Sequence, residues 1–228
     1  MGNMQSPFLI VNPKSYLYGN ESLKLAKAAD QAAKDTGLPI IFTCPYADVR
    51  MIRENTENII VCVQSMDAHT RTGNGACSSG IFKGSRSGCS FLNHAENPKT
   101  LSDLYACIRR AAELDMTSIV CADSITEAKA VACMNPDVVL AEPTDLIGTG
   151  QVADDAYTME AIDQVRKVNP DVLVVVASGV STAEDCYNMI RLGADGTGGT
   201  SGILNAPSPA VRIREMAEAI VRAVKASD

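Results

Sequence analysis

Short apolar runs alternate with longer amphipathic stretches from one end of the chain to the other. Several of the runs are continuously apolar, such as residues 172–176, where aliphatic side chains follow one another without interruption. A continuous run is typical of a strand that is buried on both faces, as in a parallel sheet covered by helices. The pattern predicts strands at Phe8–Asn12, Ile40–Cys44, Ile59–Gln64, Cys89–Asn93, Ser118–Cys121, Val138–Glu142 and Leu173–Ala177, and an eighth, glycine-rich strand at Ala194–Thr200.

The stretches between these runs have the spacing of amphipathic helices. In the last of them, Pro209–Ala226, apolar residues recur every three or four positions with charged residues between them. Helix starts are signalled by capping residues and by proline at the first helical position. The predicted starts are an Asn20 cap before Glu21–Lys34, an Asn97 cap before a helix from Pro98 through Leu114, and capping boxes at Ser124 with Glu127 and at Ser181 with Glu184.

Eight strand–helix units in 228 residues average about 28 residues each, a spacing typical of βαβ crossovers. No linker or low-complexity segment interrupts the series, so we expect residues 1–228 to form a single domain. An open sheet that binds a dinucleotide would carry a GxGxxG motif after its first strand. Here Asn12-Pro13-Lys14-Ser15 follows, with no glycine before Gly19. The prediction is therefore an α/β fold of the (β/α)8 TIM-barrel type, with eight parallel strands inside outer helices and the chemistry at the C-terminal ends of the strands.

Composition excludes several classes of partner. The chain has 20 basic and 27 acidic residues, a net charge of −7, which disfavours binding to nucleic acid. No apolar run approaches the roughly 18 residues of a membrane-spanning helix. The first eight residues lack the charged and apolar regions of a secretory signal. We therefore expect a cytoplasmic protein that binds neither nucleic acid nor membranes.

Cysteine placement argues against both disulfides and a metal site. The eight cysteines include no CxxC pair, and most lie inside apolar runs, where a thiol behaves as a small hydrophobic side chain. The two histidines, His69 and His94, have no close pair of cysteines beside them. Reduced core thiols in a cytosolic protein, with no metal, are the expectation.

Polar residues follow several of the predicted strands at the point where each strand ends, and in a barrel these ends share one rim. A cation, an imidazole, carboxylates and glycine turns would therefore meet there. Each has an ordinary alternative: Lys14 as a solvated lysine, His94 as a core histidine, Glu142 in a structural ion pair, and the glycines at 148, 150, 179 and 202 as simple turns. The strand ends are Asn12-Pro13-Lys14, Gln64, Asn93-His94-Ala95-Glu96, Glu142-Pro143, Ser178-Gly179 and Ser201-Gly202.

Three motifs at these ends resemble those of the triosephosphate isomerase family. They are Val11-Asn12-Pro13-Lys14, Asn93-His94-Ala95-Glu96 and the segment 141–150, which reads AEPTDLIGTG. They occur in the family's order and on matching strands. The similarity runs from about residue 8 to residue 225, and the short length most resembles the compact archaeal-type branch.

The resemblance implies an aldose–ketose isomerase that converts glyceraldehyde 3-phosphate to dihydroxyacetone phosphate through an enediolate, with no metal or organic cofactor. It makes Glu142 the base, His94 the neutral electrophile and Lys14 the positive charge, with Glu96 as a positioning group. It assigns substrate binding to Asn12, to Ser178 and Gly179, to Ser201 and Gly202, and to Gly148 in a lid over Pro143–Gly150. We expect the helix beginning near Pro98 to disfavour the charged form of His94.

The chain departs from the family in three places, and these keep other functions open. The segment between Gly80 and Asn93 is shortened, which predicts a reduced third helix. The turn Ala177-Ser178-Gly179 replaces the usual Gly-Ala-Gly, and Gly198 with Gly199 replaces bulky aliphatic residues. These two glycines either leave space for a longer substrate or are compensated by larger residues on neighbouring strands. Alternatives are therefore an isomerase of a four- or five-carbon sugar phosphate, and a barrel that binds phosphorylated metabolites without turnover.

The resemblance also implies a homo-oligomer, either a dimer or a tetramer. In the family the loop after strand three, here Ser65–Gly80, reaches into a neighbouring subunit. A long polar loop of this kind would be a costly flexible excursion without a partner. Its ordinary alternative is a mobile surface loop.

Overall fold

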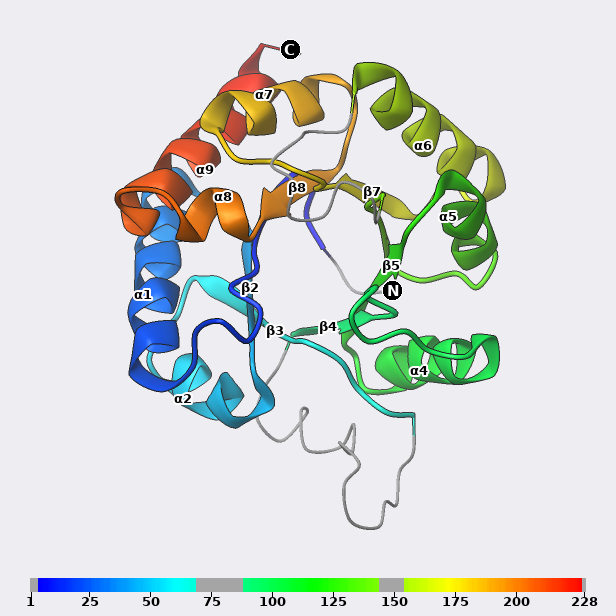
Figure 1. Cartoon of the computed structure of the whole chain (residues 1–228), viewed down its shortest axis with the longest axis horizontal. Coiled ribbons are helices and arrows are strands. Elements are labelled where there is room, and N and C mark those ends of the chain that lie inside the picture. Colours follow the sequence, from blue (N-terminus) through cyan, green and yellow to red (C-terminus); the bar gives the residue numbers. More distant parts are fainter. Residues whose placement is uncertain (1–3, 69–87, 144–153, 227–228) are drawn as a thin grey trace.

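Eight parallel strands close into a barrel in the order of the sequence, and helices surround them (Figure 1). The computed structural model describes residues 4–68, 88–143 and 154–226. The strands are β1 (Phe8–Val11), β2 (Ile40–Cys44), β3 (Ile59–Val63), β4 (Cys89–Leu92), β5 (Thr117–Ala122), β6 (Val138–Ala141), β7 (Leu173–Val176) and β8 (Gly196–Gly199). The predicted (β/α)8 barrel is confirmed, and each strand lies within two residues of its predicted bounds; β5 extends by one residue at each end, and β8 is shorter than predicted.

The helices alternate with the strands and cover the outside of the barrel (Figure 1). They are α1 (Gly19–Thr36), a short 3-10 turn η1 (Tyr46–Asp48), α2 (Val49–Glu54), α4 (Leu101–Glu113), α5 (Ile125–Ala132), α6 (Asp155–Val168), α7 (Ala183–Arg191), α8 (Ser201–Leu204) and α9 (Pro209–Lys225). None of the helices in the described ranges is both long and apolar enough to cross a membrane.

Some sequence expectations lie outside the described residues. They are Gly148 with the rest of the lid after Pro143, most of the Ser65–Gly80 loop, Cys77, and the shortened segment that follows Gly80.

Three of the predicted helix starts are wrong, those of α4, α7 and α1. The helix predicted from Pro98 begins at Leu101 and is capped by Thr100, whose hydroxyl accepts from the Asp103 N–H. The N–H of Asn97 instead donates to the carbonyl of His94 at 2.7 Å, which holds this segment in a turn.

The start of α7 also lies one residue later than predicted. The Ser181 hydroxyl donates to the carbonyl of Gly179 at 2.8 Å, so it is not free to cap. Thr182 and Asp185 form the capping box in its place.

The first helix differs in the same way, since Asn20 lies inside α1 and not before it. Tyr18 stands at the N-cap without a side-chain bond, and the Gly19 N–H donates to the Asp48 carboxylate at 2.8 Å. At α5, Ser124 caps as predicted, but the Glu127 carboxylate accepts from the Asp123 N–H and not from that of Ser124.

The core has two layers because successive strand residues point to opposite faces. Leu9 and Val11 of β1 face the helices, whereas Phe8 and Ile10 face the interior of the barrel. The interior layer contains three of the buried thiols. The described cysteines are free, as predicted; Cys44, Cys62, Cys89, Cys107, Cys121 and Cys186 are buried and Cys133 is exposed.

The glycines of β8 lie directly against β1, which fills the space that their missing side chains leave. β1 and β8 pair over their full length, with Phe8 opposite Gly196 and Ile10 opposite Gly198. A Cβ built on Gly196 would lie 2.7 Å from the ring of Phe8, and one on Gly198 would overlap the carbonyl oxygen of Ile10. The contacts therefore favour compensation by a neighbouring strand over added space at Gly198.

Gly198→Ala is expected to destabilise the barrel strongly. The added methyl group meets a backbone carbonyl, so β1 and β8 would have to separate where the barrel closes. We expect a loss of about 3 kcal/mol, at the top of the usual range for overpacking. For a chain of this size that is a fall in Tm of roughly 6–12 °C in a thermal melt. Gly88→Ala is the matched control because its methyl group would meet mainly the side chain of Ile60. Equal losses in the two variants would contradict the explanation.

Candidate active site

The C-terminal ends of the strands enclose a cavity of about 290 Å³. Residues on or directly after β1, β4 and β6 line it, together with the turns after β7 and β8. The lining includes Asn12, Lys14, His94, Glu96, Glu142, Gly179 and Ser201. Most of the polar strand ends that the sequence singles out therefore converge, whereas Gln64, Ser178 and Gly202 do not line this cavity.

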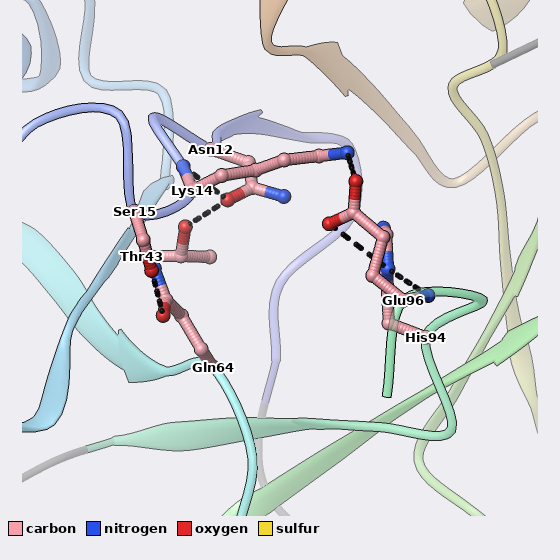
Figure 2. A network of polar contacts seen from close by, with 7 residues as sticks. All are labelled: Asn12, Lys14, Ser15, Thr43, Gln64, His94 and Glu96. Atoms are coloured by element: carbon pink, nitrogen blue, oxygen red, sulfur yellow. Dashed lines mark hydrogen bonds and ion pairs between the residues drawn. The ribbon is translucent and has the colours of Figure 1, made fainter. Parts of the chain in front are cut away.

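Asn12 and Lys14 form a tight turn after β1 (Figure 2). The Asn12 side-chain oxygen accepts from the Lys14 N–H at 3.0 Å and from the hydroxyl of Thr43 on β2. Lys14 has a φ of 51°, a left-handed conformation that is uncommon outside glycine and concentrates at functional sites. The turn directs the lysine side chain across the cavity.

The ammonium group of Lys14 binds the carboxylate of Glu96 (Figure 2). The Nζ–Oε1 distance is 2.8 Å, and the lysine side chain is only 16% exposed. This hydrogen bond lowers the pKa of Glu96, although partial burial opposes the shift. Glu96 thereby holds the cation in place at the cavity edge, in line with the positioning role that the resemblance implies.

His94 follows a second left-handed residue, Asn93, with a φ of 58°. Asn93 is anchored to the next strand, because its side-chain amide donates to the Cys121 carbonyl at 3.1 Å and to the Glu127 carboxylate at 2.9 Å. The His94 Nδ1 accepts from the Glu96 N–H at 3.1 Å (Figure 2). An accepting Nδ1 carries no proton, so the neutral ring has its proton on Nε2.

The pKa of His94 is lowered chiefly by burial and secondly by the charge of Lys14, while Glu96 opposes the shift. The sequence expectation attributed this effect to a helix starting near Pro98. That explanation is wrong, because α4 begins only at Leu101. The dipole of a helix acts mainly within its first turn.

His94 is expected to remain neutral at pH 7 with its proton on Nε2. A depressed pKa means that the ring becomes protonated only below the ordinary histidine value of about 6.5. Nitrogen-15 NMR of the imidazole measures both the tautomer and the titration, and His94→Gln assigns the signal. Lys14→Met should raise the pKa of His94, since it removes a positive charge. A charged ring at pH 7, or an unchanged pKa in Lys14→Met, would contradict this account.

Glu142 follows β6 directly and is largely buried at the cavity. Its N–H donates to the Ala122 carbonyl at 2.9 Å, which continues the pairing of β5 with β6 and fixes the backbone. Burial raises the pKa of its carboxyl group; Lys14 lowers it and Glu96 raises it further. A carboxylate in this environment is a stronger base than an exposed one.

The glycine turns contribute backbone more than side chains. Gly179 has a φ of 70° and lines the cavity, whereas the side chain of Ser178 is fully buried and does not. Ser201 begins α8 and lines the cavity. Gly202 packs so closely against Ser181 that a Cβ at position 202 would overlap the Ser181 backbone.

Sequence reasoning missed several residues of this region. The Thr43 hydroxyl donates to the side-chain oxygen of Asn12. Thr43 lies within an apolar strand, and its polar side chain was the only sequence signal for this contact. Tyr16 and Phe91 also line the cavity. In the sequence Tyr16 lies in a loop after the first strand, and Phe91 lies in a strand and resembles an ordinary core residue. A second cavity of about 400 Å³ shares Lys14, His94 and Glu96 and extends to Tyr46 and Gln64.

Together these groups can run proton transfer at carbon. A buried carboxylate can accept the proton, a neutral N–H donor and an ammonium group can stabilise an oxyanion, and backbone N–H groups at glycine turns can bind a phosphate.

Comparison with known proteins agrees with this geometry. The family model for triosephosphate isomerase matches residues 7–219. A triosephosphate isomerase from Sulfurisphaera tokodaii is 31% identical over 99% of each chain. One from Methanothermus fervidus is 30% identical over 93% of this chain and 98% of its own, and one from Methanocaldococcus jannaschii is 33% identical over 91% and 97%. The relatives are archaeal, as the short length predicted. The chain belongs to the triosephosphate isomerase family.

Proposed function

We propose that this protein interconverts glyceraldehyde 3-phosphate and dihydroxyacetone phosphate through an enediolate. The observation that carries the proposal is the meeting of Glu142, His94 and Lys14 at one cavity, as a buried carboxylate, a neutral imidazole and an ammonium group. The reaction needs a base for a proton on carbon and electrophiles for two oxygens. Membership of the family supports triose phosphates as the substrates.

Glu142 acts as the base. It removes a proton from the carbon beside the carbonyl group and returns it to the neighbouring carbon, so that the carboxyl group ends the cycle as it began. Burial of this group raises its pKa and therefore its strength as a base.

His94 and Lys14 stabilise the charge that develops on oxygen. The Nε2–H of the neutral imidazole of His94 donates a hydrogen bond to the carbonyl or hydroxyl oxygen of the substrate. Lys14 supplies a fixed positive charge, held in position by Glu96 at 2.8 Å. Asn12, whose oxygen is occupied by the Lys14 N–H and the Thr43 hydroxyl, has its side-chain NH₂ group left to bind a substrate oxygen.

The phosphate is assigned to backbone N–H groups at Ser178-Gly179 and Ser201-Gly202. Gly179 and Ser201 line the same cavity as Lys14, which supports this position. Glycine turns of this kind commonly bind phosphate at the top of a barrel. Gly148 stays assigned to substrate binding by the resemblance alone.

A coupled assay of the purified protein tests the proposal. Glyceraldehyde 3-phosphate is compared with erythrose and pentose phosphates, and exchange of deuterium at the substrate carbon is followed by NMR. We expect the triose phosphate to react fastest. Faster turnover of a longer sugar phosphate would show that the longer sugar phosphate is the preferred substrate. Binding of the sugar phosphates without deuterium exchange would show that the barrel binds them without catalysing a reaction.

We also propose a homo-oligomer. The 400 Å³ cavity beside the site is bordered by Tyr16 and Tyr46, whose rings are exposed, and apolar surface of this kind is typical of an interface. Light scattering at micromolar concentration should give a mass of two or four chains of 24.1 kDa. A monomer mass that persists as the concentration is raised would contradict the proposal.

A cytoplasmic location completes the proposal. The six buried free thiols among the described residues support it, because reducing conditions keep such groups from forming disulfides.

A further inference from the structure

The turns after β7 and β8 lie side by side at the cavity, on the part of the barrel that α7, α8 and α9 cover (Figure 1). We call residues 177–182 and 199–202 the two phosphate turns, which rests on the proposed function. Gly179 and Val180 line the cavity from the first turn, and Gly199 and Ser201 line it from the second. A phosphate bound between them requires the two backbones to keep a fixed separation.

The two turns touch through their backbones. A Cβ on Gly199 would lie 2.7 Å from the carbonyl oxygen of Val180, and one on Gly202 would lie 2.6 Å from the same oxygen and overlap Ser181. Contact alone sets how close the turns can come. It does not hold them together or fix which way their peptide groups face.

Arg212 supplies a direct link. It lies in the first turn of α9, and its Nη1 donates both to the carbonyl oxygen of Ser181 in the first phosphate turn and to that of Gly202 in the second, the latter at 3.1 Å. Its Nε lies 3.6 Å from the Glu215 carboxylate on the same helix. The side chain is 23% exposed and does not line the cavity.

These contacts affect an anion in two ways. Carbonyl oxygens carry partial negative charge, so turning two of them toward a guanidinium group removes them from the neighbourhood of a phosphate. The guanidinium group also places a permanent positive charge behind the turns, partly offset by the Glu215 carboxylate 3.6 Å from its Nε. Both effects favour a bound dianion.

We propose that Arg212 is a positioning residue for the phosphate site. It holds the two phosphate turns in register through the carbonyl groups of Ser181 and Gly202, and it does not itself touch the substrate.

Titration of glycerol 3-phosphate into the protein, followed by calorimetry, tests this. The probe has a phosphate but no carbonyl group, so it reports binding with or without turnover. Arg212→Met is expected to weaken its binding at least tenfold and to raise KM for glyceraldehyde 3-phosphate by a similar factor, with a smaller change in kcat. If Arg212→Met does not fold, Arg212→Gln, which retains one donor group, serves the same comparison.

Arg166→Met is the matched control. Arg166 also joins a backbone carbonyl to a neighbouring element, because its Nη2 lies 3.0 Å from the Gly193 oxygen and 3.0 Å from the Asp195 carboxylate. These contacts precede β8, at the opposite end of the barrel from the cavity. Arg166→Met should lower Tm at least as much as Arg212→Met and leave the affinity for glycerol 3-phosphate within twofold.

Three results would overturn the inference. They are unchanged affinity in folded Arg212→Met, an equal loss of affinity in Arg166→Met, and no binding of glycerol 3-phosphate by the unaltered protein. Isomerase activity with unchanged binding in Arg212→Met would reject this inference and leave the proposed function intact. Binding of glycerol 3-phosphate that depends on Arg212, in a protein without isomerase activity, would support this inference and reject the proposed function.

Discussion

Glu142→Gln is expected to lower kcat by about 10³-fold, within the range for loss of a general base, while the protein stays folded. The amide has nearly the shape of the carboxylate but cannot accept the proton. Affinity for glycerol 3-phosphate should change little, because the phosphate turns lie elsewhere at the cavity. Steady-state kinetics and calorimetry measure the two effects separately. A loss of less than tenfold, or 1.4 kcal/mol of barrier, would mean that another group is the base.

The pH profile gives a second measure of Glu142. The deprotonated carboxylate is the active form, so kcat/KM should fall as the pH is lowered through its pKa. Burial raises this pKa, which places the fall above the ordinary glutamate value of about 4.3. Lys14 lowers the pKa of Glu142, so Lys14→Met should move the fall to still higher pH. Glu218→Gln, on the exposed surface of α9, is the control and should leave the profile unchanged.

Lys14→Met is expected to reduce kcat/KM by about 10²-fold or more, the loss typical of removing one group that stabilises an oxyanion. The substitution retains the length of the side chain and removes the charge that faces Glu96 at 2.8 Å, His94 and Glu142. Both turnover and affinity for glycerol 3-phosphate should fall. This separates Lys14 from Glu142, whose loss should affect turnover alone.

Lys99→Met is the matched control for this variant. Its side chain is 10% exposed, close to the 16% of Lys14, and it also pairs with a carboxylate, that of Asp67 at 3.7 Å. It does not line the 290 Å³ cavity. Equal losses in the two variants would show that the loss of any half-buried lysine at this rim disturbs the site, and would remove Lys14 from its assigned role.

The strands and their order could be read from the sequence because their signal is local. A run such as Leu173–Val176 is apolar on both faces because helices cover the outside of the barrel and side chains fill its interior. Helix starts were less predictable. Asn97 and Ser181 have capping side chains, yet Asn97 lies in a turn before Thr100, which caps α4, and the Ser181 hydroxyl donates to the Gly179 carbonyl.

The site was predictable to the extent that it consists of strand ends. Asn12, Lys14, His94 and Glu142 each follow an apolar run, and closure of the barrel brings such positions together. Arg212 could not be found this way. It is one of several charged residues on an amphipathic helix, and only the packing of α9 against the turns brings its guanidinium group to Ser181 and Gly202.

The sequence by itself determined the eight strands, the barrel and the polar groups at its rim, because burial of alternating or continuous apolar positions is a property of short segments. The tertiary structure decided what depends on distances between segments. It placed the backbone of β1 where a side chain on Gly198 would lie, and it buried the side chain of Ser178. It also lowered the pKa of His94 through burial and Lys14, where the sequence had suggested a helix end. Such effects arise between residues far apart in the chain, and no local pattern carries them.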